Sequence, residues 1–258
     1  DAQEEEVVSE LDERLFATPS IALERSHVLT GEMAESAALS LGGAMKALTG
    51  YSPELAQQVR DLEEKTDHYQ DILSSYLIKL SGLKISPADS SEAAMLLKAI
   101  GDFERIGDHA LNVLESAEEI NEKGLALSDA AKREIGIMMD AVTEIVTLSF
   151  EAFYRNDLQK AYMVEPLEQV IDDLKEKLRV HHILLLQQGN CSIETGFVWS
   201  DLLTSLERVG DHCSNIAGCI VDMAHHDMNT HEALRSARVE NQHFAEQYKD
   251  FAKKYSLK

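Results

Sequence analysis

The stretch ERIGDH at residues 104–109 occurs a second time, as ERVGDH, at residues 207–212, with a single Ile/Val exchange. An asparagine follows the aspartate by four residues in both copies, at Asn112 and Asn215. Every residue of the second copy stands 103 positions after its counterpart, 207 against 104. A phrase repeated at a fixed separation indicates a duplicated structural unit.

A second pair of motifs precedes these copies. Leu62-Glu63-x-x-x-Asp67 resembles Leu167-Glu168-x-x-x-Asp172, which stands 105 positions later, 168 against 63. Because two motifs recur in the same order at nearly constant separation, the sequence predicts two internal repeats.

Apolar periodicities of helical type surround both motifs, and Pro, Ser, Asp or Gly stand where helices should begin or end. The pattern predicts three helices in each half, over residues 18–50, 52–82, 90–123, 128–154, 157–188 and 192–226. Pro166 should kink the fifth helix or displace its start, because proline has no amide donor and clashes with the preceding turn.

The predicted fold class is therefore all-α: two tandem three-helix bundles related by internal repeat, with an extra C-terminal helix. The predicted division is an acidic lead-in (1–17), a first bundle (18–125), a second bundle (126–228) and the C-terminal helix (229–258). The repeated ERxGDH phrase then lies in the third helix of each half, and the Glu-x-x-x-Asp echo lies in the second.

Composition excludes several classes of function. The formal charge of −22 would repel a phosphate backbone, so we expect no nucleic-acid partner. No apolar run has the length of a membrane span, and the N-terminus has neither the basic nor the apolar region of a signal peptide. The three cysteines form no Cys-x-x-Cys pair, which favours a reducing, cytoplasmic setting over a disulfide framework.

Spacing gives the acidic motifs a chemical meaning. Glu and Asp four residues apart lie on one face of a helix, with Cβ atoms about 5–6 Å apart. In the third helix the pair borders an apolar seam, so it should be partly desolvated, and a buried unpaired carboxylate protonates or acquires a cation. If the second and third helices pack side by side, two pairs converge into a four-carboxylate cage that suits hard or borderline cations. The predicted ligands are Glu63, Asp67, Glu104 and Asp108 in the first half, with Glu168, Asp172, Glu207 and Asp211 in the second.

Metal-free alternatives use the same residues. Arg105 and Arg208 could neutralise the neighbouring carboxylates as structural ion pairs. Asn112 and Asn215 are expected to support the ligands through hydrogen bonds, or else to be polar residues at the edge of the seam. His109 and His212 point about 100° away from the adjacent aspartate, so we leave them out of the predicted site.

The two ERxGDH copies, the asparagine after each and the Glu-x-x-x-Asp on the preceding helix resemble the PhoU family, whose members are two three-helix bundles related by internal repeat. The resemblance covers residues 18–228. Residues 11–24, LDERLFATPSIALE, are also similar to the junction before the PhoU-like region of sodium/phosphate cotransporter-type membrane proteins. On that resemblance the chain is expected to be the cytosolic region of such a transporter.

The resemblance implies a regulator of phosphate transport or phosphate signalling that is not an enzyme. Some PhoU-like proteins bind multinuclear clusters of iron or other divalent metal ions through such motifs, and the eight acids above occupy the motif positions. Expected partners are a membrane phosphate transporter, in cis or in trans, or a sensor kinase, with a homodimer as a further option. The expected location is the cytoplasm, at the inner face of the cell membrane.

Departures from the simplest motif are Gln70 and Gln169, where an extra acid would have strengthened the cage, and Pro166. A carboxylate-bridged redox or hydrolytic metalloenzyme is the alternative of a different class. Against it, no motif has a histidine three residues after its glutamate, as helical di-metal enzymes do. A metal-free helical scaffold for protein interaction is the third alternative.

Overall fold

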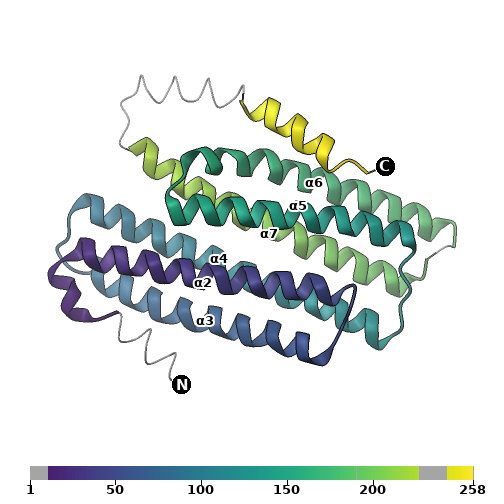
Figure 1. Ribbon diagram of the computed structural model, residues 1–258, viewed down its shortest axis with the longest axis horizontal. Helices are drawn as coiled ribbons and strands as arrows, with labels where there is room; N and C mark the ends of the chain where they lie inside the picture. The colour runs from purple at the N-terminus through teal and green to yellow at the C-terminus, as the bar shows by residue number, and fades with distance from the viewer. Residues whose placement is uncertain (1–10, 190, 227–242, 258) are drawn as a thin grey trace.

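The computed structural model describes residues 11–189, 191–226 and 243–257 of the chain. Figure 1 shows long helices running back and forth along one axis. A short 3-10 helix comes first, and six long α-helices follow. Their bounds are η1 Glu13–Ala17, α2 Pro19–Ala47, α3 Pro53–Ser81, α4 Pro87–Glu122, α5 Asp129–Arg155, α6 Leu158–Gln187 and α7 Ile193–His226.

Local chemistry explains these bounds. Ser52, Ser86 and Ser128 each accept a hydrogen bond from a backbone amide of the following first turn, which satisfies an amide that a helix N-terminus leaves unpaired. Proline occupies the first position of α2, α3 and α4, where its missing amide hydrogen costs nothing. Gly124 and Gly189 have positive φ after α4 and α6, as helix-stopping residues do.

The six predicted helices are confirmed, with one difference in their bounds. The third begins at Pro87 rather than near residue 90, because Ser86 caps it and Pro87 occupies its first position. Of the two effects predicted for Pro166, the displaced start is wrong, since α6 runs from Leu158 through that buried proline to Gln187, and the kink stays a prediction. Pro166 removes one helical hydrogen bond but is buried within α6, so its ring packs in the interior.

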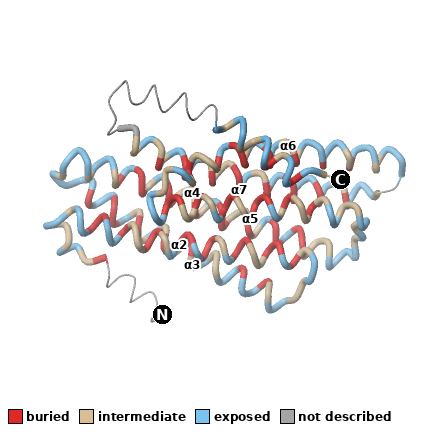
Figure 2. The backbone as a smooth tube through the Cα atoms, turned by 45° about the horizontal axis from the view of Figure 1, so that its top comes forward, coloured by how far each residue is buried: buried red, intermediate tan, exposed pale blue. Residues whose placement is uncertain are grey.

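Helices α4 and α7, which carry the ERxGDH copies, pack against each other at the centre of the molecule. Helix α2 packs on α4 and α5 packs on α7, while α3 and α6 complete the two bundles on the outside. Figure 2 shows buried positions along the inward sides of the helices. Because the repeats join through their third helices, any groups on that face of one repeat meet their counterparts from the other.

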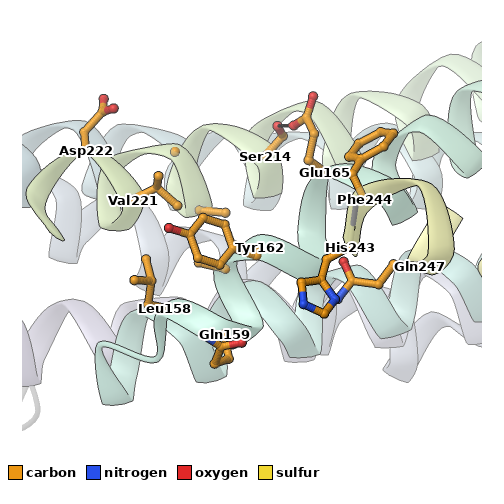
Figure 3. A pocket seen from close by; sticks show the side chains of 13 residues that line it. Leu158, Gln159, Tyr162, Glu165, Ser214, Val221, Asp222, His243, Phe244 and Gln247 are labelled. Carbon is orange, nitrogen blue, oxygen red and sulfur yellow. Dashed lines mark hydrogen bonds between the residues drawn. The ribbon is translucent and has the colours of Figure 1, made fainter. Parts of the chain in front are cut away.

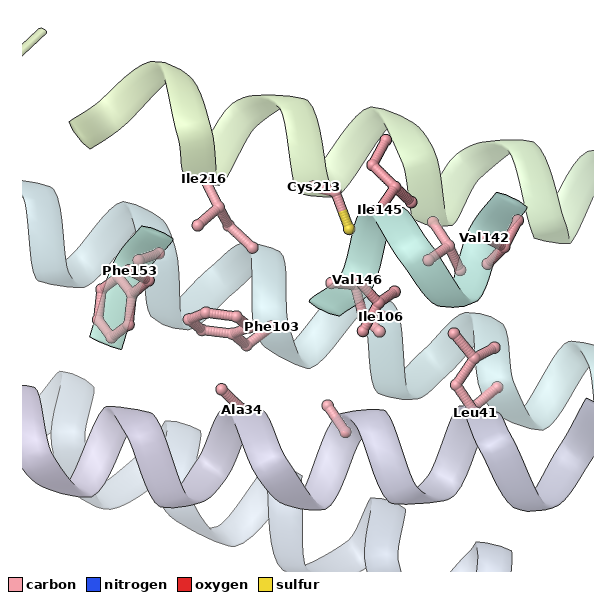
Figure 4. Close-up of a cluster of buried hydrophobic side chains, with 14 of the residues drawn as sticks. Ala34, Leu41, Phe103, Ile106, Val142, Ile145, Val146, Phe153, Cys213 and Ile216 are labelled. Atoms are coloured by element: carbon pink, nitrogen blue, oxygen red, sulfur yellow. The ribbon is translucent and has the colours of Figure 1, made fainter. Parts of the chain in front are cut away.

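One apolar core serves both repeats. In Figure 4, Phe103 of α4, Phe153 of α5 and Ile216 of α7 belong to the same cluster. The Phe103 ring stands edge-on to Phe150 and Phe153, with centroid distances of 5.1 and 5.2 Å, a favourable aromatic geometry. The two predicted bundles are thus repeats of sequence and topology that share a hydrophobic interior.

Both predicted end segments have a described part. In the lead-in, Leu11 is buried, Phe16 packs on Tyr76 of α3, and Lys79 pairs with Glu13 at 2.6 Å. Residues 243–254 are helical. Tyr248 of this segment and Tyr255 just after it bind Asp173 and Glu144 of the second repeat, and Phe251 and Tyr255 are buried. Residues 1–10 of the lead-in and 229–242 and 258 of the predicted C-terminal helix lie outside the described residues. Among the described helices, none combines the length and apolar character needed to cross a membrane.

Candidate metal centres

Three of the four predicted carboxylates converge in each repeat. One oxygen from each member of a set lies within 4.8 Å of one oxygen from each of the others. The first triad is Glu63 and Asp67 of α3 with Asp108 of α4, and the second triad is Glu168 and Asp172 of α6 with Asp211 of α7. In both triads the same helix positions provide the same residue types.

The glycine of each ERxGDH copy faces the helix that supplies two of the acids. A Cβ on Gly107 would lie 3.5 Å from Thr66 Cγ2 and 3.7 Å from Glu63 Cγ. A Cβ on Gly210 would lie 3.7 Å from Ile171 Cγ2 and 3.9 Å from Glu168 Cγ. These are ordinary van der Waals distances, so the glycines border the triads without being sterically required there.

Electrostatics in both triads favour neutralisation. Burial raises the pKa of Glu63, and Asp67 and Asp108 raise it further. In the second triad burial raises the pKa of Glu168 to about 7, with Asp172 as the next cause.

The middle acids follow the same pattern. The pKa values of Asp67 and Asp172 are raised first by burial and then by carboxylates from the facing helix. Carboxylates held together in partly buried positions favour a proton or a cation in their midst.

The fourth predicted ligand of each cage lies outside the triad. Glu104 Oε2 is 3.6 Å from Arg105 Nε, and Glu207 Oε2 is 2.9 Å from Lys175 Nζ. Burial raises the pKa of Glu104, and Asp108 raises it further. In each repeat three of the four predicted ligands thus lie within 4.8 Å of one another, and the fourth, Glu104 or Glu207, contacts a basic side chain. The role of all eight acids as metal ligands stays a prediction.

Lys175 was not predicted from the sequence, although a signal for it exists. At the offset of 105 between the acidic motifs, Lys175 is the counterpart of Gln70, a residue noted above only because it is not an acid. Aligning the two repeats at this offset would have shown a lysine beside the second motif and a glutamine beside the first. Lys175 is therefore one of the charges by which the surroundings of the two triads differ.

The two arginines behave alike. Arg105 Nη1 donates to Asp108 Oδ2 at 2.9 Å, and Arg208 Nη1 donates to Asp211 Oδ2 at 3.0 Å. Both arginine side chains are more than half exposed, and exposed ion pairs of this kind contribute little to stability. Each triad thus keeps an aspartate that is shared between an arginine and the other two carboxylates.

The histidines of the two ERxGDH copies meet each other across the α4–α7 contact. The rings of His109 and His212 stack with centroids 5.5 Å apart, and His212 Nδ1 lies 2.8 Å from Asp102 Oδ1. Burial, and then His212, lower the pKa of His109 to about 4. Omitting both residues from the carboxylate site agrees with this geometry, but their meeting could not be foreseen without knowing that α4 packs on α7.

Asn112 contacts the histidine pair, and Asn215 contacts the aspartate that binds His212. Asn215 Nδ2 donates to Asp102 Oδ1 at 3.1 Å, and Asn112 Nδ2 lies 3.4 Å from His109 Nδ1. These are contacts between the repeats or within one helix turn, and neither involves a triad carboxylate. Among the described residues, no hydrogen bond joins Asn112 or Asn215 to a triad carboxylate, so the predicted support of the ligands by these asparagines is not seen.

Two surface hollows border the site. One, of about 730 Å³, lies along α4 and α7 and is lined by Gln70, Glu104 and Arg105 among others. The other, of about 710 Å³, lies between α6, α7 and the helical segment 243–254, and Figure 3 shows Tyr162, Phe244 and His243 around it. Ser214 donates to Glu165 at its wall, and neither hollow contains a triad residue.

Comparison with known families gives one match in two parts. The model of the PhoU domain matches residues 30–117 and again residues 135–220. The matched segments each contain one triad and one ERxGDH copy, so the family repeat coincides with the repeat that the sequence predicts.

Relatives and solved structures agree. The chain is 29% identical over 188 residues to the phosphate-specific transport system accessory protein PhoU homolog 1 of Thermotoga maritima, covering 69% of this chain and 76% of that one. It is 28% identical over 222 residues to the PhoU homolog of Pseudomonas putida, with 84% of both chains covered. The crystal structure of PhoU from Pseudomonas aeruginosa has a similar fold, with a TM-score of 0.73 at 24% identity, over 78% of this chain and 96% of that chain.

Proposed function

Because this chain belongs to the PhoU domain family, we propose that it is a regulatory accessory protein of phosphate transport whose two repeats are each stabilised by metal bound at a carboxylate triad. The relatives named above are accessory proteins of a phosphate-specific transport system. A role in which the chain binds partners, and makes or breaks no bond itself, is consistent with those names.

The observation that carries the metal proposal is the duplicated convergence of three carboxylate oxygens within 4.8 Å. Such oxygens are the donors that iron, manganese, magnesium and calcium ions prefer. The raised pKa values of Glu63 and Glu168 mean that each triad resists full ionisation without a cation. The residues present therefore fit a hard or borderline divalent cation, or iron.

Bound metal would supply positive charge between two helices of each repeat. Each triad takes two acids from one helix and one from the next, so a cation there links α3 to α4 and α6 to α7. Asp108 and Asp211 lie next to the histidines at the contact between the repeats. Occupancy of a triad can therefore influence how firmly α4 and α7 are held, which is a physical route from metal to partner binding.

The partner that this proposal favours is the phosphate transporter itself, acting in trans in the cytoplasm at the membrane. The finer prediction, a region within a sodium/phosphate cotransporter-type protein, depends on residues 11–24 alone, and the relatives named above do not support it. The gene sequence upstream of Asp1 tests it, because several apolar spans there would place the transporter in cis.

The metalloenzyme and the metal-free scaffold are the two alternative functions, and they make different predictions about the triads. The metalloenzyme is disfavoured because the histidines of the two ERxGDH motifs, His109 and His212, stack on each other and belong to neither triad. The metal-free scaffold is favoured by Arg105, Arg208 and Lys175, which already contact triad or neighbouring carboxylates.

Metal analysis of the protein separates these alternatives. Protein purified without chelator should contain metal, and the Asp108→Asn, Asp211→Asn double variant should lose it. Asp61→Asn is the matched control, because Asp61 is an exposed acid of α3 that accepts only from Gln57 in the described contacts. Equal metal content in the double variant and the control would leave the metal-free scaffold as the better account.

A cellular experiment tests the regulatory role separately. Deleting the gene should change phosphate uptake by the host, and the wild-type gene should restore it. If uptake is unaffected by the deletion, the regulatory proposal fails whatever the metal content.

A further inference from the structure

The hollow of about 710 Å³ between α6, α7 and the helical segment 243–254 has the size of a small-molecule site. We refer to it as the α6–α7 hollow. Small residues line it on both helices, since Ala161 of α6 and Ala217 of α7 are buried there and Gly218 has no side chain. A Cβ on Gly218 would meet no atom within 4 Å. The open space therefore follows from small residues on two neighbouring helices.

The third wall of the hollow is held in place by contacts that lie outside it. In the segment 243–254, Tyr248 donates a hydrogen bond to Asp173 of α6, and Tyr255 just after the segment is buried. Phe244 stacks on Tyr248 with ring centroids 6.5 Å apart, and Phe244 and Gln247 line the hollow. The same helix thus contacts the second repeat with one part and faces the hollow with another.

The polar groups that line the hollow favour a positively charged ligand. Among the described residues that line it are two carboxylates, Glu165 and Asp222, and neither a lysine nor an arginine. Neither carboxylate belongs to an ion pair in the described part of the chain, although the Ser214 hydroxyl donates to Glu165. Gln247 Oε1 is buried and has no hydrogen-bond partner there either. Two anions and an unused acceptor are complementary to a cation with N–H donors.

The first repeat shows which group the corresponding place accepts. Glu165 is the counterpart of Arg60 at the offset of 105, and Val221 is the counterpart of Glu118 at the offset of 103. In the first repeat the Arg60 guanidinium reaches from α3 to Glu118 of α4 at 2.8 Å, and the Tyr51 hydroxyl lies 3.4 Å from that carboxylate. The second repeat has an acid in place of the arginine. It therefore retains a carboxylate at a position where the first repeat has a complete ion pair.

The two carboxylates of the hollow stand at its opposite ends. Ser214, which contacts Glu165, and Asp222 stand eight positions apart on α7, 222 against 214. That separation is about 12 Å along the helix axis at 1.5 Å per residue. In Figure 3, Val221 and the ring of Tyr162 lie between the two carboxylates. A ligand that matches this arrangement is long, with a positive charge at each end and methylene groups between.

We propose that the α6–α7 hollow binds a linear polyamine. One terminal ammonium lies on Glu165 and the other on Asp222, while the methylene chain packs on Val221 and on the ring of Tyr162. Aromatic rings also attract ammonium groups directly, and Gln247 Oε1 accepts a hydrogen bond from an amine of the chain. This inference depends neither on metal at the triads nor on a protein partner.

A divalent metal ion suits the hollow less well than it suits the triads. A metal ion holds its oxygen ligands at about 2.0–2.6 Å, so one ion cannot contact carboxylates at both ends of the hollow. Among the described residues, the groups of three or more possible ligands that converge are the two triads, and neither includes Glu165 or Asp222.

Isothermal titration calorimetry of the full chain tests the proposal at physiological salt. At that ionic strength the general attraction of cations to a chain of charge −22 is largely screened. Spermidine and diaminooctane should each bind one equivalent of the chain saturably. Diaminopropane has the same two charges as diaminooctane but cannot reach from Glu165 to Asp222, so it should bind about ten-fold more weakly.

Two double variants with equal loss of charge separate the hollow from the acidic surface. Glu165→Gln combined with Asp222→Asn should weaken diaminooctane binding about ten-fold. Asp61→Asn combined with Asp201→Asn removes two exposed acids elsewhere on α3 and α7, and it should leave binding unchanged. Gly218→Leu keeps every charge, fills open space with a better helix former and should abolish binding. Circular dichroism confirms that each variant is folded.

Several results would overturn the proposal. An equal loss of binding in the two double variants would show attraction to the acidic surface as a whole, and equal affinity for the two diamines would remove the argument from length. Binding that is lost in the Asp108→Asn, Asp211→Asn variant would assign the amine to the triads. Unchanged binding in Gly218→Leu would place the ligand outside the hollow.

Discussion

The two triads have the same three residue types at the same helix positions, but their surroundings differ. Beside the second triad, Lys175 neutralises Glu207, whereas Gln70 occupies the matching place in the first repeat. Glu165 raises the pKa of Glu168, whereas its counterpart Arg60 is paired with Glu118 at 2.8 Å. Duplication thus preserved the acids while the compensating charges diverged, so the two triads need not respond alike to metal or pH.

Metal removal has the largest expected effect on both repeats. A ligand at a hundred times its Kd stabilises by about 2.7 kcal/mol per site. A chelator should therefore lower the Tm of the wild type by on the order of 10 °C, since 1 kcal/mol moves a domain of this size by about 2–4 °C. Scanning calorimetry with and without chelator measures the change.

Single-site variants show whether the two triads share this effect equally. Asp108→Asn and Asp211→Asn should each remove about half of the chelator-sensitive stability. In chelator, both should be at least as stable as the wild type, because each removes a carboxylate from a repelling set. A large loss of stability in chelator would instead show that the pairs with Arg105 and Arg208 hold the site without metal.

Exchanging the charge that distinguishes the repeats should have the next largest effect. Lys175→Gln leaves Glu207 without its cation and should destabilise the metal-free protein by about 1–2 kcal/mol, since the pair is only partly buried. Gln70→Lys should stabilise the metal-free first repeat through Glu104 and weaken its metal binding. Urea denaturation and metal titration of both variants measure these changes, and a stabilised Lys175→Gln or a destabilised Gln70→Lys would contradict the role assigned to Lys175.

The pH dependence of Glu168 should be smaller. Its pKa in the fold is about 7, above the ordinary value of 4.5, so its favourable contribution is complete below pH 4.5 and is lost as pH rises through 7. Without metal, Glu168→Gln should be more stable than the wild type by roughly 1 kcal/mol above pH 7, discounted for solvent screening of a partly exposed carboxyl.

The comparison of Glu168→Gln with the wild type is needed because His109 acts in the opposite direction. Its pKa is lowered to about 4, so it contributes stability above pH 6.5 that is lost as pH falls. The difference between wild type and variant cancels that contribution. Glu63→Gln is the matched variant of the first triad. If it stabilises the metal-free protein at neutral pH as much as Glu168→Gln does, the proposed difference between the two triads is wrong.

The smallest effects are expected from the two glycines that border the triads. Gly107→Ala and Gly210→Ala place a Cβ at ordinary contact distance and gain up to about 1 kcal/mol of helix propensity. Gly43→Ala is the contrast, because its Cβ would lie 2.7 Å from the buried Val59 Cγ2 and should cost about 1–3 kcal/mol. Thermal unfolding of the three variants ranks them, and a strongly destabilised Gly107→Ala would mean that the helices cannot tolerate any added volume beside the acids.

The sequence determined the helices, their order and the duplication. Apolar periodicity, Ser caps, Pro at first positions and Gly at the ends are local properties of the chain, and they predicted α2 to α7 to within a few residues. The i, i+4 spacing likewise placed Glu63 with Asp67 and Glu168 with Asp172 on single helix faces, because the helical period alone fixes which residues share a face.

Only the tertiary structure decided which groups meet across helices. The angle and rotation at which one helix packs on another are set by the whole core, and no single motif encodes them. That packing brought Asp108 and Asp211 into the triads and left Glu104 and Glu207 outside. It also placed Lys175 on Glu207 and stacked His109 on His212, contacts between residues far apart in a sequence that records only their separate positions.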